Sequence, residues 1–317
     1  MIDLKTNKFV IWGFKSSYNT FKHIQEAWYR ALKFKFPDRE VLWLDGQDNL
    51  DNIDFSNSLF LTVNVADLRL MPKRKDTFYV CHNTDEKVKE LFGDIGSYDF
   101  MNYGVYTLTT NVDNDIKVGH DIYLSLQRHE KYSSTVLYWG TDLLPHEIEA
   151  NKPTAQVFNQ ESRDVNFVGT IYGNVHNPFK KACLENGINF NAYGGYSGGT
   201  AVSVEENQWL VKASYMAPAI GDTYHNRDNV HYFPCRTAKN ISYGCFPITN
   251  NIASKKIFPD LIFNEETRQL FYDAKEALPK IKIDTLHKLM DEVAQNHTYV
   301  TKLNGLLEAV RITQESR

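Results

Sequence analysis

Residues 230–251 read VHYFPCRTAKNISYGCFPITNN, which is the order of a loop, a short helix, a glycine and a strand. Pro234 disfavours helix at the residue before it, so we expect a helix of two turns over 237–243. Gly244 then stands where a helix ends in a residue that takes a positive φ. The short apolar run 245–249 predicts a buried strand, and the asparagines after it predict a loop.

Arg236 lies directly before this predicted helix. The N-terminus of a helix has unpaired N–H groups and a partial positive charge, which favour phosphate. An arginine at that place adds a planar cation that binds phosphate through two N–H groups. The stretch therefore predicts an anion site that fits a diphosphate. The alternative is that Arg236 caps the helix or pairs with a neighbouring acid, and that Gly244 is only a turn.

Short apolar runs alternate with helical periodicity along the whole chain. Before residue 139 we expect a helix over 20–36 and strands over 8–13, 41–45, 57–64, 77–82, 105–110 and 135–138. Glycine and proline interrupt the pattern over 139–162, where we expect the chain to cross into a second domain. A second series begins at Val165, with helices expected over 179–186, 205–213, 265–279 and 284–312 and extended segments over 190–193 and 214–220. This alternation is typical of parallel sheets in α/β domains.

The run 234–244 and the strand after it resemble the donor-site motif of GT-B glycosyltransferases, and most of all the spore-maturation-protein type within the group 1 transferases. In that group an arginine precedes the helix, a glycine closes it, and a Pro-Val/Ile-Thr strand follows. Three further segments resemble the same family: VNFVGT at 165–170, MAPAI at 216–220 and HTY at 297–299. The resemblance covers about residues 160–315, and the N-terminal half matches only in general pattern.

The resemblance implies two Rossmann-like domains that face each other across a cleft. It implies an acceptor domain over 1–155, a nucleotide-sugar donor domain over 156–300, and a helix over 301–317 that packs back on the first domain. The implied activity is the transfer of a hexosyl or deoxyhexosyl group from a nucleotide-diphosphate sugar, of UDP or GDP type, to an acceptor hydroxyl such as that of a glycan. It implies no metal and no cofactor beyond this co-substrate.

Two positions depart from the pattern of many GT-B enzymes. Lys239 stands five residues before the closing glycine, where those enzymes carry a glutamate that bonds the donor ribose. His231 stands eight residues earlier, where retaining enzymes carry an acid. The resemblance therefore leaves open the ribose contact and the stereochemistry of transfer.

The expected donor-binding residues come from these segments. They are Gly169, Thr170, Pro218, Ala219, Arg236, Lys239, Asn240, Ser242 and Thr249. Arg236 is expected to stabilise the charge that develops on the leaving diphosphate, and it is also counted among the catalytic residues. Gly169 lets a backbone approach the phosphate or the sugar, although an ordinary turn would look the same. Lys239 has a solvated side chain as its alternative, and the glycine-rich loop 194–199 is either a phosphate cradle or a mobile loop.

An inverting transfer needs a base for the proton of the acceptor hydroxyl. His82 and Asp85 follow a predicted strand and are the candidates, with His23 behind them. A structural role is the alternative for each histidine. The triplet 113–115 reads Asp-Asn-Asp, a pattern that binds a divalent metal in GT-A enzymes and also occurs in acidic turns.

Composition excludes several other classes. The net charge of −4 argues against a general nucleic-acid binder. The four cysteines form no Cys-x-x-Cys pair, which argues against zinc and fits a reducing compartment. We find neither a signal-peptide core nor an apolar window of about 18 residues, so we expect a cytoplasmic protein without a transmembrane segment. The rival functions are a GT-B-type sugar-nucleotide epimerase and a nucleotide-sugar-binding protein without turnover.

Overall fold

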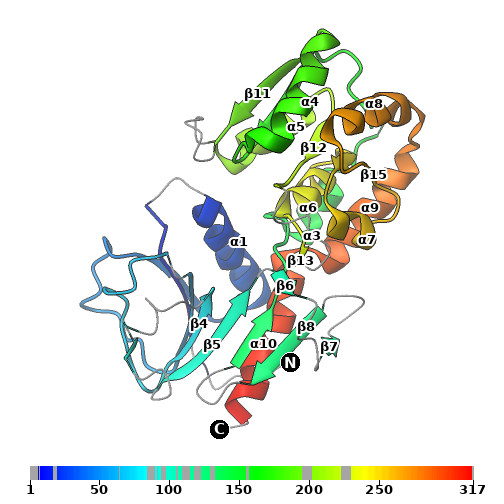
Figure 1. Cartoon of the computed structure of the whole chain (residues 1–317). Helices are drawn as coiled ribbons and strands as arrows, with labels where there is room; N and C mark the ends of the chain where they lie inside the picture. The colour runs from blue at the N-terminus through cyan, green and yellow to red at the C-terminus, as the bar shows by residue number, and fades with distance from the viewer. Residues whose placement is uncertain are drawn as a thin grey trace. The chain divides into compact units, whose positions relative to one another are not determined.

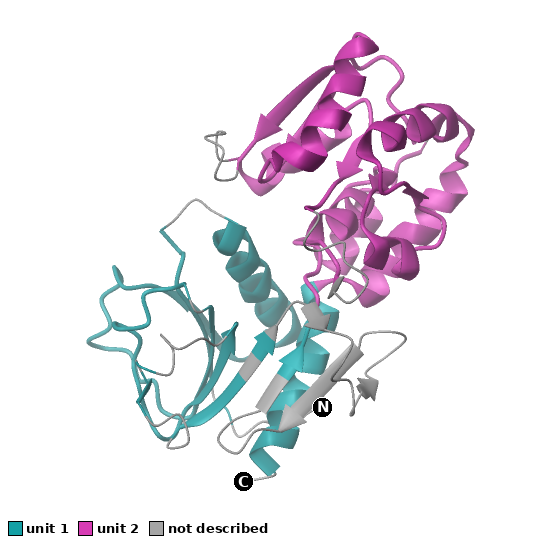
Figure 2. Cartoon of the chain, in the orientation of Figure 1, with its two compact units in different colours: residues 1–105, 111–137, 299–317 teal, residues 106–110, 138–298 magenta. Residues whose placement is uncertain are grey.

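The structure is a computed structural model of the chain. It describes residues 6, 8–16, 20–63, 65–83, 90, 92–93, 98–104, 106–108, 115–117, 123–128, 133–154, 157–194, 202–222 and 230–315. The chain divides into two compact units, shown in Figure 2. Unit 1 comprises residues 1–105, 111–137 and 299–317, and unit 2 comprises 106–110 and 138–298. The segment 138–155, which we assigned to the first domain, thus lies in unit 2.

Unit 1 is an α/β unit built on one twisted sheet of strand order β2-β1-β3-β4-β5-β9-β8-β7. The strands are β1 (Lys8–Trp12), β2 (Glu40–Leu44), β3 (Ser58–Val63), β4 (Phe78–His82), β5 (Asp99–Gly104), β7 (Asp115–Lys117), β8 (Tyr123–Arg128) and β9 (Ser133–Val136). The strands from β2 to β9 run parallel, and β8 and β7 extend the sheet antiparallel. Every residue of β3 and β4 is buried, as expected of parallel strands covered on both faces.

Two helices far apart in the sequence pack together in unit 1, α1 (Thr20–Lys35) and α10 (Tyr299–Glu315) (Figure 1). The ring centroids of Trp28 on α1 and Tyr299 on α10 lie 4.8 Å apart, edge to face. Lys35 donates a hydrogen bond to Asn304 along the same contact. The last helix is therefore part of the N-terminal unit's own core.

Unit 2 has two small sets of parallel strands with helices around them (Figure 1). The strand sets are β10 (Asp164–Val168) with β11 (Asn189–Tyr193), and β12 (Ala217–Ala219) with β14 (Pro247–Thr249) and β15 (Ile262–Phe263). The helices are α3 (Pro145–Ala150), α4 (Gly173–Glu185), α5 (Val204–Lys212), α6 (Cys235–Ser242), α7 (Ile252–Ile257), α8 (Thr267–Ala277), the 3-10 turn η3 (Leu278–Lys280) and α9 (Ile283–Asn296). The Ser214 hydroxyl accepts a hydrogen bond from Asn166 N at 2.8 Å, so the segment before β12 lies against β10.

Several elements differ from the sequence expectation. The single helix expected over 284–312 is two helices, α9 and α10. They are separated at His297–Thr298, because this segment bonds elsewhere: the His297 carbonyl accepts a hydrogen bond from Thr141 N at 2.8 Å, and Thr298 forms a parallel bridge with Thr141. Packing thus overrides a continuous helical pattern at this position.

The strand expected over 105–110 does not belong to the parallel sheet. Within it, β6 (Tyr106–Leu108) pairs antiparallel with β13 (Val230–Tyr232) of unit 2. The strands β5, β7 and β8 were not predicted. In addition, α6 begins at Cys235, so Arg236 lies inside its first turn and not before it.

Gly244 ends α6 as predicted, with φ +82°. A Cβ at this position would lie 2.7 Å from the Asn151 carbonyl oxygen, so both its backbone angle and its surroundings require glycine. Within the described part of the chain, no helix is long and apolar enough to span a bilayer.

Candidate anion site

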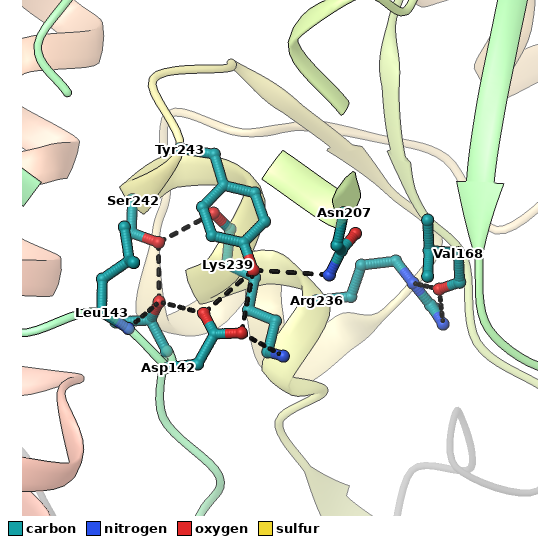
Figure 3. A network of polar contacts seen from close by, with 9 residues as sticks. Asp142, Leu143, Val168, Asn207, Arg236, Lys239, Ser242 and Tyr243 are labelled. Carbon is teal, nitrogen blue, oxygen red and sulfur yellow. Dashed lines mark hydrogen bonds and ion pairs between the residues drawn. The ribbon is translucent and has the colours of Figure 1, made fainter. Parts of the chain in front are cut away.

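The guanidinium of Arg236 extends from the first turn of α6 to the carboxyl ends of two strands. Its Nε and Nη2 donate to the carbonyl oxygen of Val168, the last residue of β10, at 3.1 and 3.0 Å. Its Nη1 donates to the carbonyl oxygen of Ile220, directly after β12, at 3.1 Å. Figure 3 shows the guanidinium held beside Val168. The side chain therefore has a fixed place at the sheet edge where α/β proteins bind their ligands.

An aromatic ring and a glycine shape the space around this cation. The Arg236 guanidinium lies over the ring of Phe167, 4.1 Å from its centroid, which is a cation–π contact. Gly169 has φ +144°, and a Cβ at this position would lie 1.9 Å from Arg236 Nη2. The backbone angle favours glycine here, and any larger residue would push the guanidinium aside, so the sequence Val-Gly-Thr after β10 is matched to the arginine.

No carboxylate among the described residues lies within ion-pair distance of Arg236. A guanidinium carries five N–H groups, and the three bonds above leave two without an acceptor in the described part of the chain. Burial lowers the pKa of Arg236 from its ordinary value, but an arginine stays protonated in proteins. A half-buried cation without a counter-charge among the described residues is costly, and a bound anion would offset that cost.

The first turn of α4 adds to the positive potential at this edge. The helix begins at Gly173, a few residues after Gly169, so the positive end of its dipole lies toward the loop that carries Gly169. His176 in this turn is buried, and its Nδ1 lies 3.0 Å from both the backbone N and the carbonyl oxygen of Tyr172. Burial lowers the pKa of His176 to about 4, and it outweighs the backbone hydrogen bond of Tyr172, which raises that pKa. His176 is therefore neutral at pH 7, and Arg236 supplies the charge.

Lys239 lies one turn further along α6 and has a partner. Its Nζ donates to Oδ2 of Asp142 at 2.7 Å, and the Tyr243 hydroxyl donates to both oxygens of the same carboxylate at 2.9 and 3.0 Å. The Thr141 and Ser242 hydroxyl oxygens are 2.6 Å apart in the same network (Figure 3). The side chains of Asp142 and Lys239 are only 3% and 15% exposed.

These contacts set the charges of the buried pair. Burial alone would raise the pKa of Asp142, but the Lys239 ammonium and the hydrogen bonds outweigh it and leave that pKa below its ordinary value. Burial alone would lower the pKa of Lys239, but Asp142 holds it above its ordinary value. Both groups are therefore charged at pH 7. The network anchors the segment that enters unit 2 to α6.

The other expected donor-binding side chains also have internal contacts. Asn240 Nδ2 donates to the Ala217 carbonyl oxygen at 3.1 Å, and the Ser242 hydroxyl donates to the Lys239 carbonyl oxygen at 2.8 Å. The Thr249 hydroxyl donates to the Ala219 carbonyl oxygen at 2.9 Å. The side chains of Asn240, Ser242, Thr249 and Ala219 are all buried, and Pro218 lies in β12 between two of these partners. Thr170 follows Gly169 and is partly exposed. Their roles in donor binding stay predictions.

The catalytic base also stays a prediction. His82 ends β4 and is 4% exposed, between the rings of Phe21 and Tyr103. Burial lowers its pKa to about 3, so it is neutral at pH 7 and a weak proton acceptor. Asp85 lies outside the described residues, and His23 lies on α1.

Other expectations fall on parts that the structure leaves out. Of the glycine-rich loop 194–199, only Gly194 is described, and its φ is +68°. Asp113 and Asn114 of the Asp-Asn-Asp triplet lie outside the described residues. Where residues are described, no three histidine, cysteine, aspartate or glutamate side chains are grouped as they would be around a metal ion.

Sequence reasoning did not identify Phe167, His176, Asp142 or Tyr243. Phe167 lies in a quoted motif, and an aromatic residue two before a strand-end glycine was a usable signal. Asp142 is 97 residues from its lysine partner, and nothing in the local sequence links the two. Comparison with known proteins adds no assignment: no protein-family model matches the chain, and no curated protein shows a significant match to it.

Proposed function

We propose that the chain is a metal-independent glycosyltransferase that moves a sugar from a nucleotide-diphosphate donor to an acceptor hydroxyl. The two-domain GT-B arrangement, with unit 2 as the donor domain, is part of this proposal. The family resemblance over about residues 160–315 supplies the reaction class. The observation that carries the proposal is the half-buried Arg236, which has no carboxylate partner among the described residues and lies against a glycine at the strand ends.

In the proposed reaction, negative charge develops on the leaving diphosphate, which would bind next to Arg236. The acceptor oxygen forms a bond to the anomeric carbon, and the bond from that carbon to the diphosphate oxygen breaks. The electron pair leaves with the diphosphate, and the acceptor's proton goes to a base, for which His82 and Asp85 are the candidates. A fixed cation at the diphosphate lowers the barrier, because it stabilises charge that grows as the bond breaks.

The departure at Lys239 has a structural explanation that fits this proposal. Lys239 pairs with Asp142, so it neutralises a buried carboxylate of its own unit. Its charge is thereby compensated, and Arg236 is the cation of α6 that a diphosphate would meet. A ribose contact from this position is not part of the proposal.

The first experiment is a thermal-shift screen against UDP, GDP, CDP, dTDP and their common sugar conjugates. A ligand that binds only the folded state raises the melting temperature by mass action, whatever the acceptor is. We expect a shift with one diphosphate and a smaller one with its monophosphate. If none of the diphosphates raises the melting temperature, the proposal of a donor site at Arg236 is contradicted.

The rival functions are separated by products. A transferase releases the nucleotide diphosphate only when an acceptor is supplied, whereas an epimerase converts the donor to an isomer without one. A binding protein gives a thermal shift and neither product across a broad acceptor panel. EDTA should leave transfer intact, and loss of activity restored by Mn²⁺ would favour the Asp-Asn-Asp triplet at 113–115.

A further inference from the structure

Unit 2 contains a hollow of about 390 Å³ at the opposite end of its strands from Arg236. Met216 and Phe246, directly before β12 and β14, line it. Arg236 instead bonds the carbonyls at the far ends of β10 and β12. A three-residue strand is about 10 Å long, so the hollow and the anion site are separate places.

Aromatic rings form much of the wall of this hollow. Phe158 and Tyr215 meet edge to face with ring centroids 4.8 Å apart, and both are nearly buried. The backbone of Asn151 lies against Gly244, and both residues line the hollow. That approach requires glycine, since a Cβ at Gly244 would lie 2.7 Å from the Asn151 carbonyl oxygen. The hollow thus has aromatic rings on one part of its wall and polar groups on the rest.

One charged side chain, Lys212, belongs to the lining. The side chain is exposed, and its Nζ donates to Oδ1 of Asn151 at 2.7 Å, which holds the ammonium at the rim of the hollow. No carboxylate of a described residue lies within ion-pair distance of it. Its charge also acts on the thiol in the lining: burial raises the pKa of Cys245 to about 12, and the Lys212 charge partly opposes that rise.

We propose that this hollow binds a small organic anion, a carboxylate attached to an aromatic or branched apolar body. The carboxylate meets the Lys212 ammonium and the carboxamide of Asn151, and the body packs against the rings of Phe158 and Tyr215. A hollow of about 390 Å³ is within the range of small-molecule sites, so a ligand with about a dozen non-hydrogen atoms fits. The site is independent of the proposed donor site, because it shares none of the Arg236 contacts.

Binding titrations with matched probes test the proposal. The probes are 4-hydroxyphenylacetate and indole-3-acetate, each with its neutral amide. We expect both acids to bind and the amides to bind about tenfold more weakly or worse, because a charged hydrogen bond is replaced by a neutral one. Lys212→Met should remove the preference for the acid, and Lys212→Arg should keep it. Lys181→Met, at an exposed lysine of α4, is the control and should change nothing.

Thiol labelling locates the bound probe. Cys245 lines the hollow, whereas Cys235 lies next to Arg236, and both are half-buried. The acid should slow alkylation of Cys245 and leave Cys235 unaffected, with the two sites resolved by mass spectrometry. A nucleotide diphosphate should do the reverse, so a failure of the donor site and a failure of this site give different patterns.

Each outcome either supports or overturns the proposed site at Lys212. Acid-selective binding that disappears in Lys212→Met supports the proposal. Equal binding of acid and amide would also overturn the proposal, because the Lys212 charge would then have no role in binding. No binding of either acid at millimolar concentration, or acid binding that persists in Lys212→Met, would overturn the proposal.

Discussion

The two cations of α6 lie three residues apart and have opposite surroundings. Lys239 faces a buried carboxylate, Asp142, and the hydroxyl of Tyr243 completes that group's hydrogen bonds. Arg236 faces two backbone carbonyls and an aromatic ring, and no acid among the described residues lies within ion-pair distance of it. Both side chains are largely withdrawn from water.

This difference distinguishes a cation that stabilises the fold from a cation that can bind a ligand. A buried cation that already has its counter-charge inside the protein holds the fold together, and its removal leaves an uncompensated acid. A buried cation without one keeps its attraction for an anion from outside. On the same helix, Lys239 thus holds the segment at Asp142, and Arg236 lies with its charge at the carboxyl ends of the strands.

Lys302 is a second basic side chain with no acid within ion-pair distance among the described residues, and unlike Arg236 it makes no hydrogen bond there. It is 1% exposed on α10, and burial lowers its pKa to about 7. A lysine can lose its proton and remain buried as a neutral amine, whereas an arginine cannot. A lysine without an acid partner is therefore weak support for an anion site, whereas an arginine without one keeps its charge and is stronger support.

The largest effect is expected from Asp142→Asn. This change leaves the Lys239 ammonium buried without its partner, and breaking such a pair typically costs about 3–5 kcal/mol. For a unit of this size that corresponds to a fall in melting temperature of about 10 °C. Asp142→Asn combined with Lys239→Met should recover part of the loss, since no buried charge is then uncompensated. Similar melting temperatures for wild type and the single variant would contradict the structural role.

The same pair predicts a pH dependence. The folded pKa of Asp142 is below its unfolded value, so its contribution is fully present above about pH 4 and is lost as the pH falls through the folded pKa. The gap in stability between wild type and Asp142→Asn should therefore stay constant from pH 7 to 5 and narrow in stronger acid. Chemical denaturation across this range measures it.

Lys302→Met should stabilise the protein by about 4–5 kcal/mol at pH 6, because burial lowers the pKa from 10.5 to about 7 and one pKa unit corresponds to about 1.4 kcal/mol. The folded pKa lies below the unfolded value of 10.5, so between pH 7 and 10.5 the unfolded chain binds more protons and wild-type stability rises with pH. The benefit of the variant should thus shrink toward pH 10. Lys288→Met, at an exposed lysine of α9, is the control. If Lys302→Met stabilised the protein equally at pH 6 and pH 10, a charge effect would be refuted.

Gly169→Ala tests the fit between the strand-end glycine and Arg236. The new Cβ would lie 1.9 Å from Arg236 Nη2, so the guanidinium must leave its place, and we expect about a tenfold loss in affinity for the preferred diphosphate. Gly187→Ala is the matched control. It has φ +70° and no heavy atom within 4 Å of its Cβ, so it introduces backbone strain without displacing the arginine. Equal loss in both variants would assign the effect to strain.

The smallest effect is expected at the surface. Arg268 and Glu185 form an ion pair at 2.7 Å with side chains 44% and 39% exposed. Glu185→Gln should leave the midpoint of denaturant unfolding almost unchanged, because solvent and salt screen such pairs. A loss as large as that of Asp142→Asn would mean that burial does not separate the two kinds of pair.

Much of the fold follows from local pattern, and the site follows only in part. The quoted stretch 230–251 predicted a short helix, its glycine end and the strand after it, because proline, glycine and apolar residues act on their immediate neighbours. It also singled out Arg236. The partners of Arg236 and Lys239 were not predictable, since Val168 and Asp142 are 68 and 97 residues away and contribute through tertiary packing.

Calorimetric titration of the preferred nucleotide diphosphate into wild type and Arg236→Ala tests the central claim most directly. We expect the affinity to fall by about 10- to 100-fold, as for the loss of a charged hydrogen-bonded contact, while Lys302→Met binds like wild type. Arg236→Lys should fall between the two, because it keeps the charge and loses the planar set of donors. Affinity in Arg236→Ala equal to that of wild type would contradict the assignment of Arg236 as the diphosphate site.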